Sequence, residues 1–195
     1  KVYEDIFHAG KWAGIFQFTE QGSQKFCKRV KPRNIIDISA VTSIFRPGPL
    51  AANVHDDFME AREHPHRISY LTDEVREITE ETYGFLIFQE QIAKIAHNNF
   101  EYFSGYGFNK SHAVSYSMLS YQCAFLFAYY PVEWLAAFLD KEPESRKEKA
   151  INIAKKYGYK IAPLDINKSG VIWEISEDGK TLIQPLTSIK GLGMA

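Results

Sequence analysis

The residues best suited to chemistry are four consecutive polar residues at the start of a long apolar segment: Asn109, Lys110, Ser111 and His112. Gly105 and Gly107 precede them and permit tight backbone geometry, and a helix is predicted over about 113–130. Asn109 or Ser111 can cap this helix, whose first turn presents unpaired N–H groups with a partial positive charge. Together with the lysine and the histidine, these groups suit the binding of phosphate oxygens. By spacing alone, a capped helix start that binds nothing is the more frequent arrangement.

One arginine lies at the start of a rigid turn. Arg46 is followed by Pro47-Gly48-Pro49, which ends the preceding helical pattern. A rigid turn fixes the direction of the guanidinium group, whose planar fork suits bidentate phosphate contacts. The same group can equally bond the last carbonyl groups of the preceding helix, and both interpretations stay open.

Two further segments are candidates for contact with a nucleic-acid backbone. The stretch from Lys25 to Arg33 is strongly basic and includes Lys28 and Arg29. A solvated helix face is the alternative interpretation. The last segment, 188–193, has the shape of the hairpin in helix-hairpin-helix DNA modules, where glycine-flanked backbone amides meet a phosphate, and its candidate residues are Lys190, Gly191 and Gly193.

Other chemistry-bearing residues are weaker candidates. His64 and His66 have no third metal ligand at a recognisable spacing, so no metal site is predicted there. Cys27 and Cys123 are far apart, which excludes a disulfide framework and a zinc ribbon and favours structural thiols. The adjacent carboxylates Asp56-Asp57 and Glu80-Glu81 need not converge and are interpreted as surface acids.

The composition is that of an ordinary packed protein. Of 195 residues 45% are hydrophobic and 24% are charged, and the formal net charge is −1, which excludes a disordered chain and a globally basic one. The most apolar stretch, Cys123 to Val132, is too short to span a bilayer. A reducing, cytoplasmic compartment is expected. Because the chain begins with Lys1 and has no leader, we expect an internal piece of a longer protein.

The patterns predict a mainly α (α+β) fold. The segment 54–81 holds nine acids and three arginines and is predicted to be a solvated surface. The long segment 113–130 is apolar on nearly every side and is predicted to be a core helix. A strand or strand-like connector is predicted at 13–18, and strands are predicted at 83–88, 160–163, 171–175 and 180–184, the last two forming a hairpin. Further helices are predicted at 23–30, 35–45, 89–96, 132–139 and 146–157.

Four segments, in this order, resemble the alpha subunit of bacterial DNA polymerase III. They are Gly14-Ile15-Phe16-Gln17-Phe18, Ile44-Phe45-Arg46-Pro47-Gly48-Pro49-Leu50, Thr82-Tyr83-Gly84-Phe85 through Phe88-Gln89-Glu90-Gln91, and 105–113, which includes Asn109-Lys110-Ser111-His112. The stretches 120–122, 130–133 and 161–167 continue the similarity, so that the resemblance covers nearly the whole chain.

The resemblance implies a piece of a C-family replicative DNA polymerase, a nucleotidyltransferase that extends a primer with deoxynucleotides. It implies the end of the palm and start of the fingers in 1–50, the fingers in 51–140, and in 141–195 a small mixed α/β region leading into a helix-hairpin-helix domain. It places Arg46 and 109–112 at the incoming nucleotide or primer-template. The partners implied are primer-template DNA, deoxynucleotides, the other polymerase domains, the sliding clamp and other replisome subunits, and no membrane.

Two departures from the family qualify this prediction. The family's catalytic carboxylates, which hold Mg²⁺, lie upstream of the matched region, so no catalytic or metal-binding residue is assigned and this piece alone is not expected to polymerise. Between Gln91 and Gly105 the family has several dozen more residues, which are either deleted here or left out of the chain, with the junction within 92–104. The alternative functions are a non-catalytic nucleic-acid-binding or assembly module derived from such a polymerase, and an unrelated helical scaffold.

Overall fold

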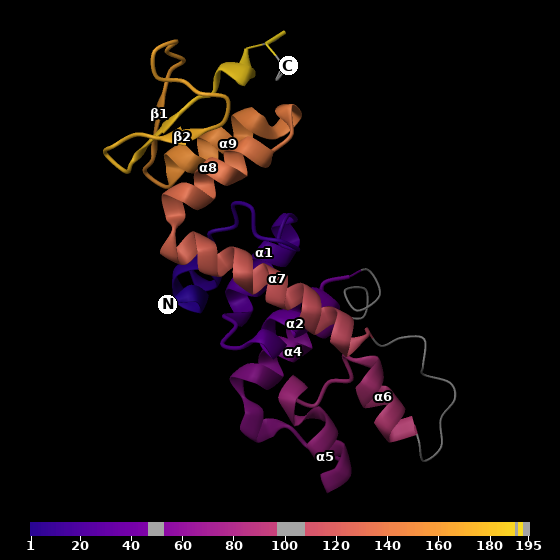
Figure 1. Ribbon diagram of the computed structural model, residues 1–195. Coiled ribbons are helices and arrows are strands. Elements are labelled where there is room, and N and C mark those ends of the chain that lie inside the picture. The colour runs from indigo at the N-terminus through magenta and orange to yellow at the C-terminus, as the bar shows by residue number, and fades with distance from the viewer. Residues whose placement is uncertain (47–52, 97–107, 190, 193–195) are drawn as a thin grey trace. The chain divides into compact units, whose positions relative to one another are not determined.

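The computed structural model describes residues 1–46, 53–96, 108–189 and 191–192 and divides the chain into two compact units, Lys1–Ala124 and Phe125–Ala195 (Figure 1). Most of the described residues are helical, and three short strands form one sheet. The expectation of a mainly α (α+β) fold is therefore confirmed. The division into 1–50, 51–140 and 141–195 stays a prediction.

The first unit is built from helices. A π-helical turn, η1 (Tyr3–His8), precedes α1 (Gln21–Val30), α2 (Ile35–Ile44), α4 (Val54–Glu63), α5 (Asp73–Thr79), α6 (Gln89–Ala96) and the first part of α7 (Lys110–Tyr129). Two 3₁₀ turns, η2 (Pro65–Arg67) and η3 (Glu80–Thr82), connect them. The side chain of Asn34 caps α2 by accepting a 2.8 Å hydrogen bond from the Asp37 amide. Ile38, Val41 and Ile44 of α2 are fully buried in the core.

Helix α1 forms because its sequence is amphipathic. Phe26, Cys27 and Val30 are buried, whereas Lys25, Lys28 and Arg29 are exposed. The helix ends at Lys31, whose φ of +50° is left-handed, immediately before Pro32, which cannot continue a helix. The predicted basic helix is confirmed, and α1 packs on α2 and α4.

Two predicted strands of this unit are wrong. The segment 13–18 forms turns, because Gly14 and Gln17 have φ values of +71° and +67° that break an extended backbone. The segment 83–88 begins with a turn in which Tyr83 and Gly84 have φ values of +54° and +85°. Within the described residues, its strand-like pairing consists of one bridge between Phe88 and Phe108. Both segments bury apolar side chains without pairing as strands.

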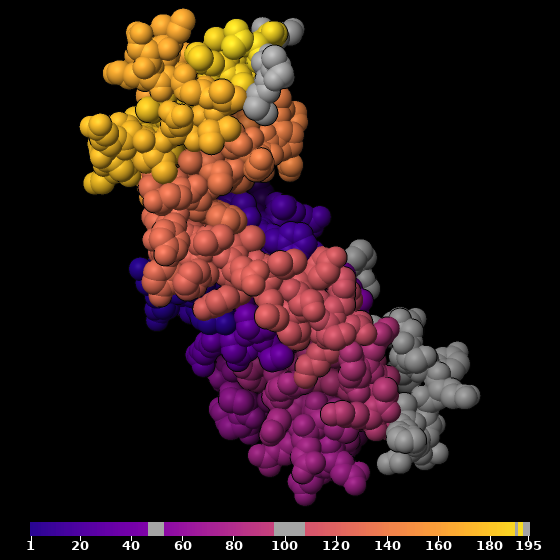
Figure 2. All heavy atoms as spheres, in the orientation of Figure 1, coloured from indigo at the N-terminus to yellow at the C-terminus, as the bar shows by residue number. Residues whose placement is uncertain are grey.

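The prediction that α7 is a core helix is also wrong. Met118 and Leu119 are 50% and 47% exposed, whereas Ser117 and Ser120 are fully buried. Ser39 Oγ of α2 donates a 3.0 Å hydrogen bond to Ser117 Oγ, and Ser120 Oγ donates one of 2.8 Å to the Phe16 carbonyl. Small hydrogen-bonded residues thus face the core, and larger apolar ones lie at the surface, where α7 is visible in Figure 2.

The second unit is a small mixed α/β structure. Helices α8 (Pro131–Lys141) and α9 (Glu144–Lys156) pack beside a sheet of β1 (Lys160–Ala162), β2 (Glu174–Ile175) and β3 (Thr181–Ile183), and the turn η5 (Leu186–Ser188) follows. The strand order is β1-β3-β2, with β1 parallel and β2 antiparallel to β3. Leu135, Leu139 and Leu182 are fully buried in its core.

The predicted hairpin between β2 and β3 is confirmed. In its turn the Asp178 carboxylate accepts hydrogen bonds from the Thr181 hydroxyl at 2.6 Å and from the Lys180 and Thr181 amides at 2.9 Å. The hydrogen bond from the Thr181 hydroxyl group is the main reason that the pKa of Asp178 is lowered. Among the described residues, no helix combines the length and apolar composition of a membrane span.

Candidate functional site

The starts of α6 and α7 lie side by side, although about twenty residues separate them in the sequence. Phe88 and Phe108 form a parallel bridge, in which the Phe108 amide donates to the Ile87 carbonyl at 3.0 Å and the Gln89 amide donates to the Phe108 carbonyl at 2.9 Å. This pairing places residues 88–91 against the start of α7. Two motifs that carry the family resemblance therefore form one site.

A buried glutamine fixes the loop before α6. Gln91 is 3% exposed, and its Oε1 accepts hydrogen bonds of 3.0 Å from the amides of Ile87 and Phe88. Its Nε2 donates to the Ile78 carbonyl at 3.1 Å and to Thr82 Oγ1 at 2.7 Å. Since buried polar groups need partners, this one side chain satisfies two backbone amides and joins α5, η3 and α6.

The N-terminus of α7 is capped by two side chains. Asn109 Oδ1 accepts hydrogen bonds from the His112 amide at 2.8 Å and from Ser111 Oγ at 2.7 Å, so Asn109 is the capping residue. The two carboxylate oxygens of Glu90 accept from the Lys110 amide at 2.9 and 2.8 Å. A carboxylate is favoured here because the helix dipole places partial positive charge at this end.

The ammonium group of Lys110 is paired with a carboxylate. Its Nζ lies 2.5 Å from Glu81 Oε1, and the two side chains are 31% and 36% exposed. The same Nζ lies 5.7 Å from the centroid of the Phe88 ring, within the range of a cation–π contact. The lysine is therefore held near the Phe88 ring by Glu81 of η3, an acid that the sequence alone indicates to be a surface residue.

A row of rings connects Arg46 with the first half of α7. The Arg46 guanidinium lies 5.1 Å from the centroid of Phe108, and Phe108 lies 5.5 Å from the His112 ring. The centroids of His112 and Tyr116 are 4.0 Å apart, and Tyr116 lies 5.3 Å from Phe16. His112 and Tyr116 are four residues apart on α7, and residues at this spacing are neighbours on a helix surface. The structure thus brings Arg46 to the same site as 109–112.

The predicted DNA-contacting residues lie elsewhere. Lys25 and Lys28 of α1 are exposed, and Arg29 is exposed but paired with Asp56 of α4 at 2.9 Å. In the second unit Gly191 has a φ of +94°, the left-handed region that glycine tolerates. Lys190 and Gly193 lie outside the described residues, as do the turn residues 47–50 and residues 97–104 of the predicted junction 92–104.

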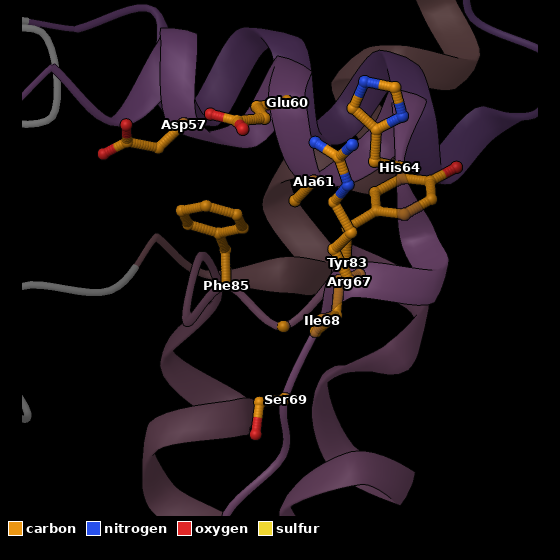
Figure 3. A pocket seen from close by; sticks show the side chains of 10 residues that line it. Asp57, Glu60, Ala61, His64, Arg67, Ile68, Ser69, Tyr83 and Phe85 are labelled. Carbon is orange, nitrogen blue, oxygen red and sulfur yellow. The ribbon is translucent and has the colours of Figure 1, made fainter.

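A separate hollow of about 350 Å³ lies between α4, the segment 67–69 and the loop 83–85. Asp57 and Glu60 of α4 line it, together with His64 just after this helix, and the ring of Phe85 lies opposite the two acids (Figure 3). In the described ranges no three His, Cys, Asp or Glu side chains gather as a metal site. Cys27 is fully buried, and burial, followed by the charge of Asp37, raises the pKa of its thiol above the ordinary range.

Glu81 and Glu90 are the site residues that sequence reasoning missed. Glu90 lies within the stretch 88–91 that carries the resemblance, so the sequence identifies its segment but not its partner. Glu81 stands in an acidic run, and nothing in that run distinguishes it from Glu80. Only the fold shows that Glu81 contacts Lys110, 29 residues away.

Comparison with known proteins identifies one family and several relatives of this chain. The model of the bacterial DNA polymerase III alpha subunit finger domain matches residues 1–118. The DNA polymerase III subunit alpha of Treponema pallidum is 32% identical over 94% of this chain and 20% of its own length. That of Campylobacter jejuni is 32% identical over 100% of this chain and 21% of its own, and that of Escherichia coli K12 is 26% identical over 97% and 21%.

The chain therefore spans about a fifth of the length of the curated relatives it matches. The alignment with the Campylobacter protein runs over 250 positions, against 195 residues here, so the relative carries several dozen residues that this chain lacks within the matched stretch. The match over 1–118 covers more than half of the chain, including the paired starts of α6 and α7. The chain belongs to the bacterial DNA polymerase III alpha subunit finger domain family.

Proposed function

We propose that this chain is the fingers segment of a DNA-directed DNA polymerase and that it contacts the incoming deoxynucleotide at the start of α7. Arg46, Lys110 and His112 would bind and position the triphosphate. Phosphoryl transfer needs positioning and charge neutralisation more than covalent chemistry, and cationic side chains held by the fold provide both.

The observation that carries the proposal is that Arg46 and His112, both predicted to lie near phosphates, contact the same Phe108 ring next to the start of α7. Arg46 follows the end of α2, and its guanidinium group lies over the Phe108 ring, which also contacts the His112 ring. Lys110 is the first residue of α7, the helix that contains His112. Arg46 is more than sixty positions from Lys110 and His112 in the sequence. Arg46 and the residues at the start of α7 are predicted from separate motifs. Because the fold brings them close together, they could bind the same ligand.

Mg²⁺ belongs to the proposed reaction but has no site among the described residues, which hold no suitable group of ligands. We assign its carboxylates to other parts of the parent enzyme. Bound there, the ions would supply charge stabilisation to the reacting oxygens. The contribution of this chain is to bind and orient the phosphates of the incoming nucleotide.

The test uses the complete polymerase subunit that contains this segment. Lys110→Ala and Arg46→Ala are expected to raise the KM for the deoxynucleotide in Mg²⁺-dependent primer extension by roughly ten- to hundredfold, because each removes a charged hydrogen-bond donor. Thermal unfolding should change little, since the Lys110 side chain is 31% exposed. Lys141→Ala is the matched control, because Lys141 is 87% exposed and belongs to α8. An unchanged KM, or parallel loss of activity and stability, would refute the proposal.

A second candidate function is a nucleic-acid-binding module without chemistry. It is favoured by the exposed lysines of α1, which could contact a phosphate backbone without a metal. Salt-dependent binding of primer-template DNA by the complete subunit, together with no primer extension in Mg²⁺, would identify this function instead.

A further inference from the structure

The proposed phosphate site contains two carboxylates whose role the proposed function does not explain. Glu90 bonds a backbone amide, so it belongs to the cap of α7. Glu81 bonds the ammonium group of Lys110, which is the side chain proposed to meet a phosphate. The two acids therefore act on different parts of the same residue.

The two contacts differ in how easily they can be exchanged. The Lys110 amide is fixed by the helix, and Glu90 holds it through both carboxylate oxygens. The Glu81 pair joins two side chains that are each about one-third exposed, and such pairs are weak because water screens them. A phosphate oxygen arriving at Lys110 would compete with Glu81 for the ammonium group rather than with Glu90.

Glu81 opposes anion binding whether or not it leaves. If it moves away, the ion pair with Lys110 is lost before the phosphate pair forms. If it stays, a carboxylate lies within a few ångströms of a second anion, and like charges at that distance repel. Either way the negative charge of Glu81 reduces the affinity of the site.

We propose that Glu81 is an affinity-setting residue: its carboxylate neutralises Lys110 in the free protein and is exchanged for a phosphate of the incoming nucleotide. This inference rests on the proposed function, because it assumes that Lys110 meets a phosphate. In the opposite role, Glu81 would hold Lys110 in the orientation that binds phosphate and would thereby increase the affinity. The two roles predict opposite effects of removing the charge.

The experiment titrates inorganic tripolyphosphate, without metal, into the ¹⁵N-labelled 195-residue chain and follows the amide signals of Ser111 and His112. Glu81→Gln removes the charge and keeps the shape of the side chain. Glu80→Gln is the matched control, because Glu80 is the neighbouring acid and pairs with Arg76 instead. Lys110→Ala removes the proposed phosphate partner.

The expected result is that Glu81→Gln binds tripolyphosphate roughly two- to fivefold more tightly than the parent chain, the range set by a partly exposed ion pair. Glu80→Gln should bind as the parent does, and combining Glu81→Gln with Lys110→Ala should abolish the gain.

If Lys110→Ala weakens binding but Glu81→Gln leaves it unchanged or weaker, Glu81 does not compete, and the inference is wrong while the proposed function stands. If none of the variants differs from the parent in phosphate binding at Ser111 and His112, Lys110 meets no phosphate, and both are wrong. An equal gain in Glu80→Gln and Glu81→Gln would show a general charge effect and also overturn the inference.

Discussion

The guanidinium group of Arg62 donates a 3.0 Å hydrogen bond to the carboxylate of Asp37, and the two side chains are only 6% and 3% exposed. The same guanidinium donates to the carbonyl groups of Val30 and Lys31 and to the hydroxyl group of Tyr83, each at 3.0 Å. Asp37 also accepts a 2.8 Å bond from the Arg33 amide. One buried ion pair thus joins α4 to the end of α1, the start of α2 and the loop before α6.

Arg62→Ala is expected to destabilise the fold strongly. It leaves the Asp37 carboxylate buried without its cation, and breaking a buried ion pair in this way costs about 3–5 kcal/mol. The free energy of unfolding in urea measures this loss. Arg76→Ala is the comparison, because its pair with Glu80 is exposed and should contribute less than ~1 kcal/mol. Equal effects of the two substitutions would contradict the assigned role of Arg62.

Gln91→Leu tests whether Gln91 holds the loop before α6. Leucine has a similar volume but cannot accept from the Ile87 and Phe88 amides, and each buried amide left unsatisfied costs about 1–3 kcal/mol. We expect a loss of at least ~2 kcal/mol in the free energy of unfolding. Gln89→Leu changes the neighbouring glutamine, which is only half-buried, and should cost less. A loss no larger than that of Gln89→Leu would mean that the loop is held by other contacts.

Local patterns are sufficient to predict much of the fold. The spacing of Phe26 and Val30 identifies α1, which buries one face. Ile38, Val41 and Ile44 identify α2, although the fold buries this helix on nearly every side. The Glu177–Gly179 turn identifies the β2–β3 hairpin, since its signal is contained in a few adjacent residues. Such features depend on neighbours in the sequence.

The remaining features depend on residues far apart in the sequence. The apolar composition of α7 does not show which face is buried, because the inner face is set by Ser117 and Ser120 meeting distant partners. Arg62 lies in an acidic segment predicted to be a solvated surface, yet it is buried by contacts with α1 and α2. In the candidate site, the capping role of Asn109 follows from its position, whereas the pairing of Lys110 with Glu81 requires the fold.

The basic face of α1 is expected to contribute to DNA binding through its exposed lysines more than through Arg29. Lys25→Ala and Lys28→Ala should each reduce affinity of the complete subunit for primer-template DNA and lower the slope of log affinity against log salt by about 0.9 per lost phosphate contact. Arg29→Ala should have a smaller effect, because its guanidinium is already paired with Asp56. Equal salt slopes in the parent and both lysine variants would exclude α1 from the DNA contact.

Tyr3 is expected to make the fold sensitive to alkaline pH. Burial, and then the charges of Tyr121 and Asp37, raise the pKa of Tyr3 from 10.0 to about 12. The folded state therefore keeps the phenolic proton where the unfolded state has lost it, so the contribution of Tyr3 is complete below pH 10 and is lost as the pH rises towards 12. Urea unfolding at several values between about pH 8 and pH 12 measures the decline.

Tyr3→Phe has no phenolic group at this position, so its free energy of unfolding should fall less steeply with pH above 10 than that of the parent chain. The phenylalanine ring retains the apolar part of the contacts with Phe7 and Tyr121, whose centroids lie 6.1 and 5.4 Å away. Tyr130→Phe is the control, because Tyr130 is 54% exposed. If the parent and Tyr3→Phe lose stability in parallel above pH 10, the alkaline transition arises from other groups, and the Tyr3 hydroxyl group is not protected by the fold.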